Sequence, residues 1–163
     1  IQAACYLTGK EPVSVRGFAS KVHPELFPDG VEETMSFEML FNDGFQALCR
    51  ASYSQSYHQC TTLGNGGFIE IRGGIGENGR PGSAFTQSSG TPNPKALFHN
   101  RREILAEQTL QQAVLLDSFA IAIKNGDKAF KTSGEMGLRD IWIAEKVYES
   151  AAKGGVSVEA KFR

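Results

Sequence analysis

The feature that most constrains the fold is a pair of segments in which apolar and polar residues alternate. They lie on either side of a short sequence that is typical of a tight turn. Residues 33–41 (ETMSFEMLF) alternate apolar and polar side chains, and residues 45–57 resume the alternation after Asn42-Asp43-Gly44. An Asp-Gly pair tolerates the positive φ angles that short hairpin loops require. The sequence therefore predicts two antiparallel strands, each with one covered face.

The remaining periodic segments supply more strands and three helices. Residues 13–18, 60–63, 68–72 and 156–158 have strand patterns, and residues 1–8, 101–125 and 138–153 have helical ones. Gly9 and Pro12 follow the first helix as stop signals. Thr132 and Glu135 have capping-box spacing before the last helix. Residues 73–100 are rich in Gly, Pro, Ser, Asn and Thr, and we expect a long loop there that is either functional or disordered.

These elements predict an α+β fold: an open, predominantly antiparallel sheet with helices packed on one face. The length of 163 residues suits a single domain, residues 1–163. The helical pattern begins at Ile1 without an N-cap, so we expect the chain to be a piece of a longer protein.

Composition narrows the class of function. A net charge of −1 argues against a binder of nucleic acid or of anionic membranes, both of which need a basic face. Within the sequence, no apolar run reaches the roughly 18 residues of a membrane span. Three cysteines, Cys5, Cys49 and Cys60, fit neither a zinc pattern nor a disulfide framework. We expect reduced thiols in a cytoplasmic protein.

Several motifs that suggest a site have plainer explanations. Residues 74–79 match G-x-G-x-x-G, but the next residues, Arg80-Pro81-Gly82, do not open a helix, so we expect no nucleotide site there. The three histidines are far apart, and we expect no metal centre. We assign the carboxylates of Glu32-Glu33 to solvation. Residue patterns alone predict no catalytic residue.

One polar cluster is a candidate binding site. Residues 52–59 (SYSQSYHQ) combine tyrosine rings, amides and hydroxyls at the end of a predicted strand. Rings that cover C–H faces and polar groups that pair with hydroxyls suit a polyhydroxy ligand. A solvated strand end or an oligomer interface explains the same composition equally well.

Three segments, in order along the chain, resemble the glucose–fructose oxidoreductase/inositol dehydrogenase family. Residues 6–13 (YLTGKEPV) are similar to the junction of the family's catalytic helix with the first strand of its sheet domain. Residues 119–126 (FAIAIKNG) are similar to its Phe-x-x-Ala-Ile-x-x-Gly segment. Residues 134–140 (GEMGLRD) and 144–151 (AEKVYESA) resemble its last helix.

The resemblance implies that this chain is the carboxyl-terminal domain of a two-domain oxidoreductase that acts on a sugar or polyol-like alcohol. A Rossmann domain, absent from this chain, would bind NAD or NADP and contribute the catalytic lysine. We therefore expect this chain alone to bind no cofactor and to carry no catalytic residue. Family members place substrate contacts on the strand that matches residues 53–57. The implied substrate-pocket residues are Tyr53, Gln55 and Tyr57, with Gln111 as a weaker candidate.

A sheet with helices on one face leaves its other face to be covered. We expect Val13/Val15, Met35/Phe37/Met39 and the apolar series of residues 45–53 to make that open face too apolar for solvent. A homo-oligomer, dimer or tetramer, would then form through it. The alternative from another class is a non-catalytic binding or assembly domain that is complete as it stands.

Overall fold

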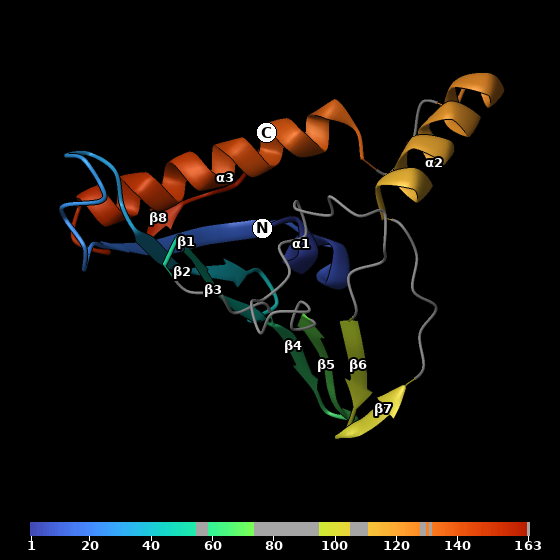
Figure 1. Ribbon diagram of the computed structural model, residues 1–163, viewed down its shortest axis with the longest axis horizontal. Helices are drawn as coiled ribbons and strands as arrows, with labels where there is room; N and C mark the ends of the chain where they lie inside the picture. Colours follow the sequence, from blue (N-terminus) through green and yellow to red (C-terminus); the bar gives the residue numbers. More distant parts are fainter. Residues whose placement is uncertain (55–58, 74–94, 105–110, 128–129, 131, 163) are drawn as a thin grey trace. The chain divides into compact units, whose positions relative to one another are not determined.

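The computed structural model describes residues 1–54, 59–73, 95–104, 111–127, 130 and 132–162 (Figure 1). The chain divides into two compact units. The first comprises residues 1–54 and 131–163, and the second comprises residues 55–130. We describe each unit by itself.

The first unit is a four-stranded antiparallel sheet with strand order β3-β2-β1-β8. The predicted hairpin of β2 and β3 is present, and Gly44 in its turn has φ 84°. Gly9 ends the first helix in the left-handed conformation, φ 65°, as the sequence predicted. The elements of this unit are α1 (Gln2–Thr8), β1 (Pro12–Ser20), β2 (Thr34–Phe41), β3 (Gln46–Ser52), α3 (Gly134–Ala152) and β8 (Val158–Glu159).

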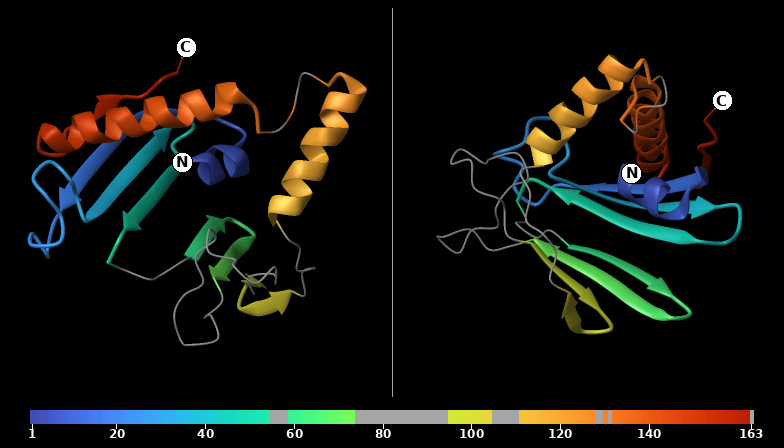
Figure 2. Two further views of the ribbon diagram at one scale, coloured as in Figure 1. Left: turned by 45° about the horizontal axis from the view of Figure 1, so that its top comes forward. Right: turned by 90° about the vertical axis from the view of Figure 1, so that its right-hand side faces the viewer.

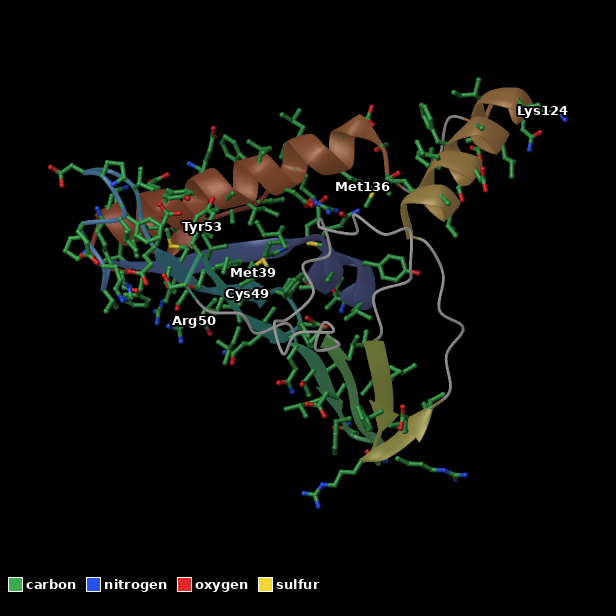
Figure 3. The ribbon with its side chains drawn as sticks, viewed as in Figure 1. Met39, Cys49, Arg50, Tyr53, Lys124 and Met136 are labelled. Atoms are coloured by element: carbon green, nitrogen blue, oxygen red, sulfur yellow. The ribbon has the colours of Figure 1, made fainter. Side chains whose placement is uncertain are left out.

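Helix α3 covers one face of this sheet, and the core lies between the two (Figure 2). Met39 and Ile143 are fully buried there. Arg50, which precedes Ala51 and follows Cys49 on β3, extends from the opposite face (Figure 3). The buried hydrophobic residues of the cluster are Cys5, Val15, Met35, Met39, Phe41, Ile143, Val147 and Ala160.

Our prediction of which residues lie on the open face of the sheet was therefore wrong. Val15, Met35 and Met39 line the side that α3 covers, so they need no second copy of the chain to bury them. The sequence showed which residues share a face, but not which of the two faces the helix would occupy. The open face carries Arg16, Glu38, Leu48 and Arg50 instead.

Helix α3 contacts β1 at very short range. A Cβ at Gly17 would lie 2.5 Å from the carbonyl oxygen of Val147. The hydroxyl of Ser150, which is fully buried, accepts a hydrogen bond from the Gly17 amide at 3.0 Å and donates to the carbonyl of Val156. The helix and the segment that follows it are thus both bound to β1.

The last helix begins earlier than expected and has a different cap. Ser133 is the N-cap of α3 and accepts a hydrogen bond from the Met136 amide at 3.4 Å. The predicted capping pair of Thr132 and Glu135 is therefore wrong by one residue. Glu135 lies in the first helical turn, where a carboxylate interacts favourably with the helix dipole.

The described residues of the second unit form a four-stranded antiparallel sheet, in the order β4-β5-β6-β7, and the helix α2. Asn65-Gly66 joins β4 to β5, because Gly64 pairs with Gly67. A two-residue turn with positive φ at both Asn100 (49°) and Arg101 (71°) joins β6 to β7. The elements are β4 (Gln59–Gly64), β5 (Gly67–Gly73), β6 (Lys95–His99), β7 (Arg102–Ile104) and α2 (Gln111–Asn125).

Two predictions for this unit were wrong in part. The helix predicted over residues 101–125 is present at Gln111–Asn125, but residues 102–104 form β7 instead, where Ile104 pairs with Leu97. Residues 105–110 lie outside the described residues. The long loop predicted over residues 73–100 contains β6. The rest of that loop, residues 74–94 with the G-x-G-x-x-G match, lies outside the described residues.

The predicted class is confirmed: the protein is α+β, with open antiparallel sheets and helices. Its strands divide between two four-stranded sheets. None of the helices within the described residues is long and apolar enough to cross a membrane.

The contact between Gly17 and α3 gives a test of the packing. Gly17→Ala places a methyl group against the α3 backbone, which cannot yield without moving the helix. We expect a loss of about 1–3 kcal/mol in the free energy of unfolding, as for other overpacked sites. Gly137→Ala is the control, because no atom lies within 4 Å of its added Cβ and alanine favours a helix. Urea unfolding should show that Gly137→Ala is neutral or stabilising; equal effects of both variants would contradict the packing.

Candidate functional site

The structure describes one of the four predicted pocket residues in full. Tyr53 lies directly after β3, and its side chain is 82% exposed. Gln55 and Tyr57 lie outside the described residues. Gln111 is the first residue of α2, in the second unit, and its side chain is also outside the description. The four residues are therefore not shown to form one site, and their role in substrate binding stays a prediction.

Tyr53 is held in place at the strand end from two directions. Its amide donates to the carbonyl of Glu33 at 3.0 Å. Its ring packs against Phe27, with ring centroids 6.0 Å apart and planes inclined by 41°. Phe27 belongs to the loop between β1 and β2. The ring of Tyr53 thus presents most of its surface and its hydroxyl to solvent in a fixed position.

The same loop is anchored by the carboxylate of Glu33, which is only 3% exposed. One carboxylate oxygen accepts hydrogen bonds from the amides of Val22 (2.6 Å) and His23 (2.8 Å). The other lies 2.9 Å from Nδ1 of His23. We had assigned Glu33 to solvation, and this was wrong: its backbone holds Tyr53 and its side chain holds the loop.

These contacts shift the pKa values of both partners. A hydrogen bond from the Ser54 side chain is the largest cause that lowers the pKa of Glu33 to about 2, and hydrogen bonds from His23 and Val22 add to it. The hydrogen bond to Glu33 raises the pKa of His23. Near neutral pH Glu33 is therefore ionised.

Helix α3 contributes a second tyrosine to this region. Tyr148 donates a hydrogen bond from its hydroxyl to Glu32, next to the buried Glu33. That hydrogen bond is the main cause that raises the pKa of the Tyr148 phenol, which stays protonated. The charge of Tyr53 contributes in the same direction, because the two phenols lie near each other.

We call Phe27, Glu32, Tyr53 and Tyr148 the strand-end cluster. Three rings and two phenol hydroxyls beside a carboxylate can cover a C–H face and exchange hydrogen bonds with hydroxyl groups. Sequence reasoning found Tyr53 and missed the other three. Phe27 lies in a segment that we predicted only as a loop, and we assigned the carboxylate of Glu32 to solvation. Tyr148 lies within a helix motif that we used only for the resemblance.

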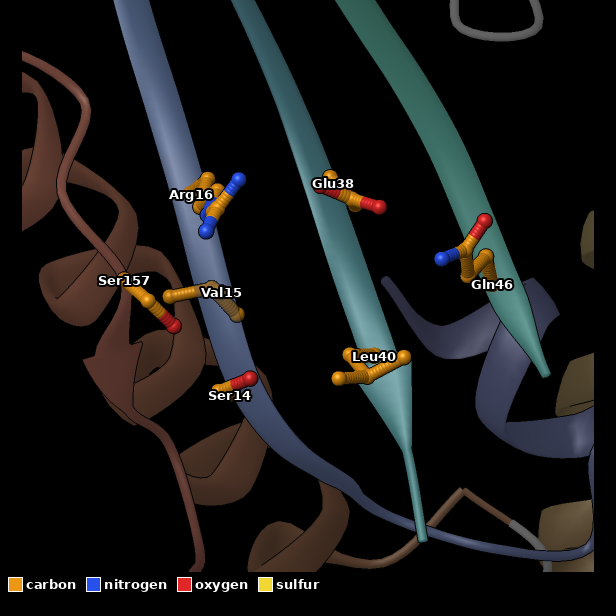
Figure 4. Close-up of a pocket in the computed structure, with 7 residues that line it drawn as sticks. All are labelled: Ser14, Val15, Arg16, Glu38, Leu40, Gln46 and Ser157. Carbon is orange, nitrogen blue, oxygen red and sulfur yellow. The ribbon is translucent and has the colours of Figure 1, made fainter. Parts of the chain in front are cut away.

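A second candidate lies on the open face of the first unit's sheet (Figure 4). A shallow pocket of about 170 Å³ crosses β1, β2 and β3. Arg16 lies directly opposite Glu38, and Gln46 lies opposite Leu40. The residues that line it are Ser14, Val15, Arg16, Glu38, Leu40, Gln46 and Ser157. Its small volume and mixed charge suit a contact surface better than a substrate site.

Metal chemistry has no support in the described part of the chain, where no three His, Cys, Asp or Glu residues form a ligand group. Within the described residues, Cys5, Cys49 and Cys60 form no disulfide. Burial raises the pKa of the Cys5 thiol, which makes it a poor nucleophile.

Comparisons with known proteins identify the fold. No family model matches the sequence, and a search of curated proteins found no match. Among solved structures, the chain is similar to an aldose–aldose oxidoreductase from Caulobacter crescentus in complex with glycerol. The TM-score is 0.74, the identity is 25%, and the match covers 97% of this chain and 44% of that one.

Two further structures share the fold at lower identity. One is myo-inositol 2-dehydrogenase from Lactobacillus plantarum, with a TM-score of 0.64, 19% identity, and coverage of 99% of this chain and 46% of that one. The other is an inferred oxidoreductase from Thermotoga maritima, with a TM-score of 0.68, 18% identity, and coverage of 97% and 43%. The chain thus spans less than half the length of each of these proteins.

The fold is therefore that of an α+β domain found in oxidoreductases. It confirms the resemblance that the sequence motifs predicted: the chain has the fold of a carboxyl-terminal domain of the glucose–fructose oxidoreductase/inositol dehydrogenase family.

The Glu33 anchor predicts a pH dependence of stability. A carboxyl group whose pKa is lowered on folding stabilises the folded state above its ordinary pKa of 4.5, and this stabilisation is lost as the pH falls towards 2. We expect Glu33→Gln to be less stable than the unaltered chain near pH 5, and the difference to shrink steadily below pH 4.5. Urea unfolding over this range measures it.

His23 supplies the control for that experiment. Its pKa is raised, so its contribution is fully present below the ordinary value of 6.5 and is lost as the pH rises through the higher folded value. His23→Ala should therefore remove the loss of stability on the alkaline side. It should also reduce the acid-side loss in part, because the His23 side chain is one of the donors that lower the pKa of Glu33. A difference between Glu33→Gln and the unaltered chain that does not change between pH 5 and pH 2 would contradict the anchor.

Proposed function

We propose that this chain is the carboxyl-terminal domain of an NAD- or NADP-dependent oxidoreductase that acts on a sugar or polyol-like alcohol. The observation that carries the proposal is the likeness over 97% of the chain to an aldose–aldose oxidoreductase whose structure contains glycerol, a polyol. The nicotinamide, its Rossmann domain and the catalytic groups belong to the rest of the protein. This chain provides part of the substrate-pocket wall.

The strand-end cluster supports the assignment of that wall to Tyr53 and the residues after it. Tyr53 is fixed by Phe27 and by the Glu33 carbonyl, yet its hydroxyl is free to meet a ligand. A preorganised ring loses little entropy when it binds a sugar. Gln55 and Tyr57 follow in sequence, and Gln111 is kept as the fourth candidate.

The first test reads the gene. The coding sequence upstream of Ile1 should contain a Gly-x-Gly-x-x-Gly turn between a strand and a helix, and a lysine further on. The protein that it encodes, assayed with NAD or NADP and a panel of aldoses and inositols, should reduce the nicotinamide with at least one of them. An upstream sequence without this pattern would favour the non-catalytic binding or assembly domain.

Substitution of Tyr53 tests the pocket wall in that same enzyme. Tyr53→Phe removes one neutral hydrogen bond, worth about 1 kcal/mol, so we expect KM for the sugar to rise roughly fivefold. Tyr53→Ala also removes the ring and should raise KM further, with little change in KM for the nicotinamide. Tyr6→Phe, at another exposed tyrosine, is the matched control. Unchanged kinetics in Tyr53→Ala would remove this residue from the pocket.

We also propose a homo-oligomer, a dimer or tetramer, that forms through the open face of the first unit's sheet. The support differs from what the sequence suggested. Leu48 is 82% exposed in the middle of the edge strand β3, directly opposite Glu38, which itself lies opposite Arg16. An exposed leucine within a ring of charged groups is a common arrangement at protein interfaces.

Light scattering tests the assembly. We expect the chain to form at least a dimer, and we expect Leu48→Asp to shift it to a monomer because a carboxylate would be buried without a partner. Leu63→Asp, at a leucine of similar exposure in β4, should leave the assembly unchanged. A stable monomer of the unaltered chain at high concentration would contradict the proposal.

A further inference from the structure

Strand β8 leaves an open edge on the first unit's sheet. It is the last strand in the order β3-β2-β1-β8. The Ala160 amide donates to the carbonyl of Val13 at 3.0 Å, and Val158 lies opposite Val15. Because alternate residues of a strand point their backbone groups to opposite sides, those of Ser157 and Glu159 point away from β1. In the described part of the chain, no strand pairs with this outer side.

A groove of about 570 Å³ runs along this edge, between β8 and helix α3. This volume falls within the range of ligand sites, roughly 300–1,000 Å³. The helix wall is formed by residues spaced four, three and four apart, which share one face of the helix: Trp142, Lys146, Glu149 and Lys153. The opposite wall is residues 156–159 with Lys161.

The groove has more hydrogen-bond donors than acceptors. Glu149 accepts from Lys146 and from Lys153, each at 2.7 Å. An ammonium group has three donors, so each lysine keeps two for another partner. Lys146 also lies over the Trp142 ring, 4.6 Å from its centroid. The Trp142 indole nitrogen is buried and has no acceptor among the described residues. A ligand rich in carboxylates and carbonyls would satisfy the remaining donors of the two lysines.

An extended strand beside an edge strand and a helix supplies such groups. Its amides and carbonyls would pair with those of Ser157 and Glu159, which is how β-strand addition provides affinity. Its acidic side chains would reach the lysines. A second copy of β8 fits poorly, because antiparallel pairing centred on Glu159 would set two like charges opposite each other.

We propose that this groove binds an extended, acidic segment of another polypeptide, which adds to the sheet as a strand beside β8. Affinity comes from the backbone groups of Ser157 and Glu159, and preference for acidic segments comes from Lys146, Lys153 and Lys161. The site is independent of the strand-end cluster and of the proposed oxidoreductase activity.

Trp142 provides the measurement, because it is the only tryptophan in the chain and lines the groove. We expect a short synthetic peptide of alternating glutamate and valine to change its fluorescence in a saturable way. The same peptide with lysine in place of glutamate should bind at least about tenfold more weakly, since its charges face the lysines. No saturable change with the acidic peptide, or equal binding of the two peptides, would overturn the proposal.

Two substitutions at one position separate strand addition from simple charge attraction. Glu159→Pro removes the outward amide but leaves the pairs with β1 intact, because proline is tolerated at a strand edge. Glu159→Ala keeps the amide and removes the same charge. We expect Glu159→Pro to bind the acidic peptide about fivefold to tenfold more weakly than Glu159→Ala, because the proline variant loses one backbone hydrogen bond to the peptide. Equal affinities would exclude pairing with β8.

A charge substitution tests the preference for acidic segments without relying on the folding of the proline variant. Lys161→Glu should weaken binding of the acidic peptide and strengthen that of the basic one. Lys10→Glu, at a lysine whose partner is Asp43, should change neither. Circular dichroism confirms that each variant is folded. Identical peptide binding in Lys161→Glu and the unaltered chain would overturn the proposed recognition of acidic segments.

Discussion

The structure of the first unit depends on the close approach of helix α3 to strand β1. Only a residue without a Cβ allows the Val147 carbonyl to lie so near Gly17. At the same point, the buried Ser150 hydroxyl joins the Gly17 amide to the Val156 carbonyl. In the β1–β8 register, Gly17 and Val156 would form the next hydrogen-bonded pair after Val15 and Val158. The hydroxyl thus inserts into the ladder where the strands separate. It sets both the height of the helix above the sheet and the course of the chain into β8.

One residue performs a comparable task at the end of the same sheet. The backbone carbonyl of Glu33 accepts from the Tyr53 amide, and its carboxylate accepts from the loop amides of Val22 and His23. A buried carboxylate is stable only when donors surround it, and here they come from the loop and from the Ser54 side chain. The loop that carries Phe27 is therefore positioned against Tyr53 by a charge rather than by an apolar core. This is why the ring of Tyr53 can be both ordered and exposed.

The sequence predicted the elements with strong local signals and failed where tertiary contacts decide. The hairpin at Gly44, the helix end at Gly9 and the class of the fold all follow from turn chemistry and periodicity. The turn at Asn100 and Arg101 lacks glycine, so residues 102–104 read as part of a helix although cross-strand pairing places them in β7. Alternation identified the shared face of Met35 and Met39, but not which face α3 covers.

In the candidate site, the sequence predicted Tyr53 because it belongs to a run of polar residues. Phe27, Glu32 and Tyr148 were not, since only the fold brings three distant segments together.

The protonation states in the strand-end cluster favour recognition over proton transfer. Glu32 keeps the Tyr148 phenol protonated, and the donors around Glu33 keep that carboxylate ionised with its lone pairs occupied. General acid–base catalysis needs a group whose pKa lies near the working pH. The hydrogen bond to Glu33 raises the pKa of His23 in the anchor and occupies its Nδ1. A ligand that meets Tyr53 and Tyr148 would therefore find fixed hydrogen-bonding groups and a ring surface. In the oxidoreductase that we propose, such a surface would orient the alcohol, and the hydride and proton would be exchanged with groups outside this cluster.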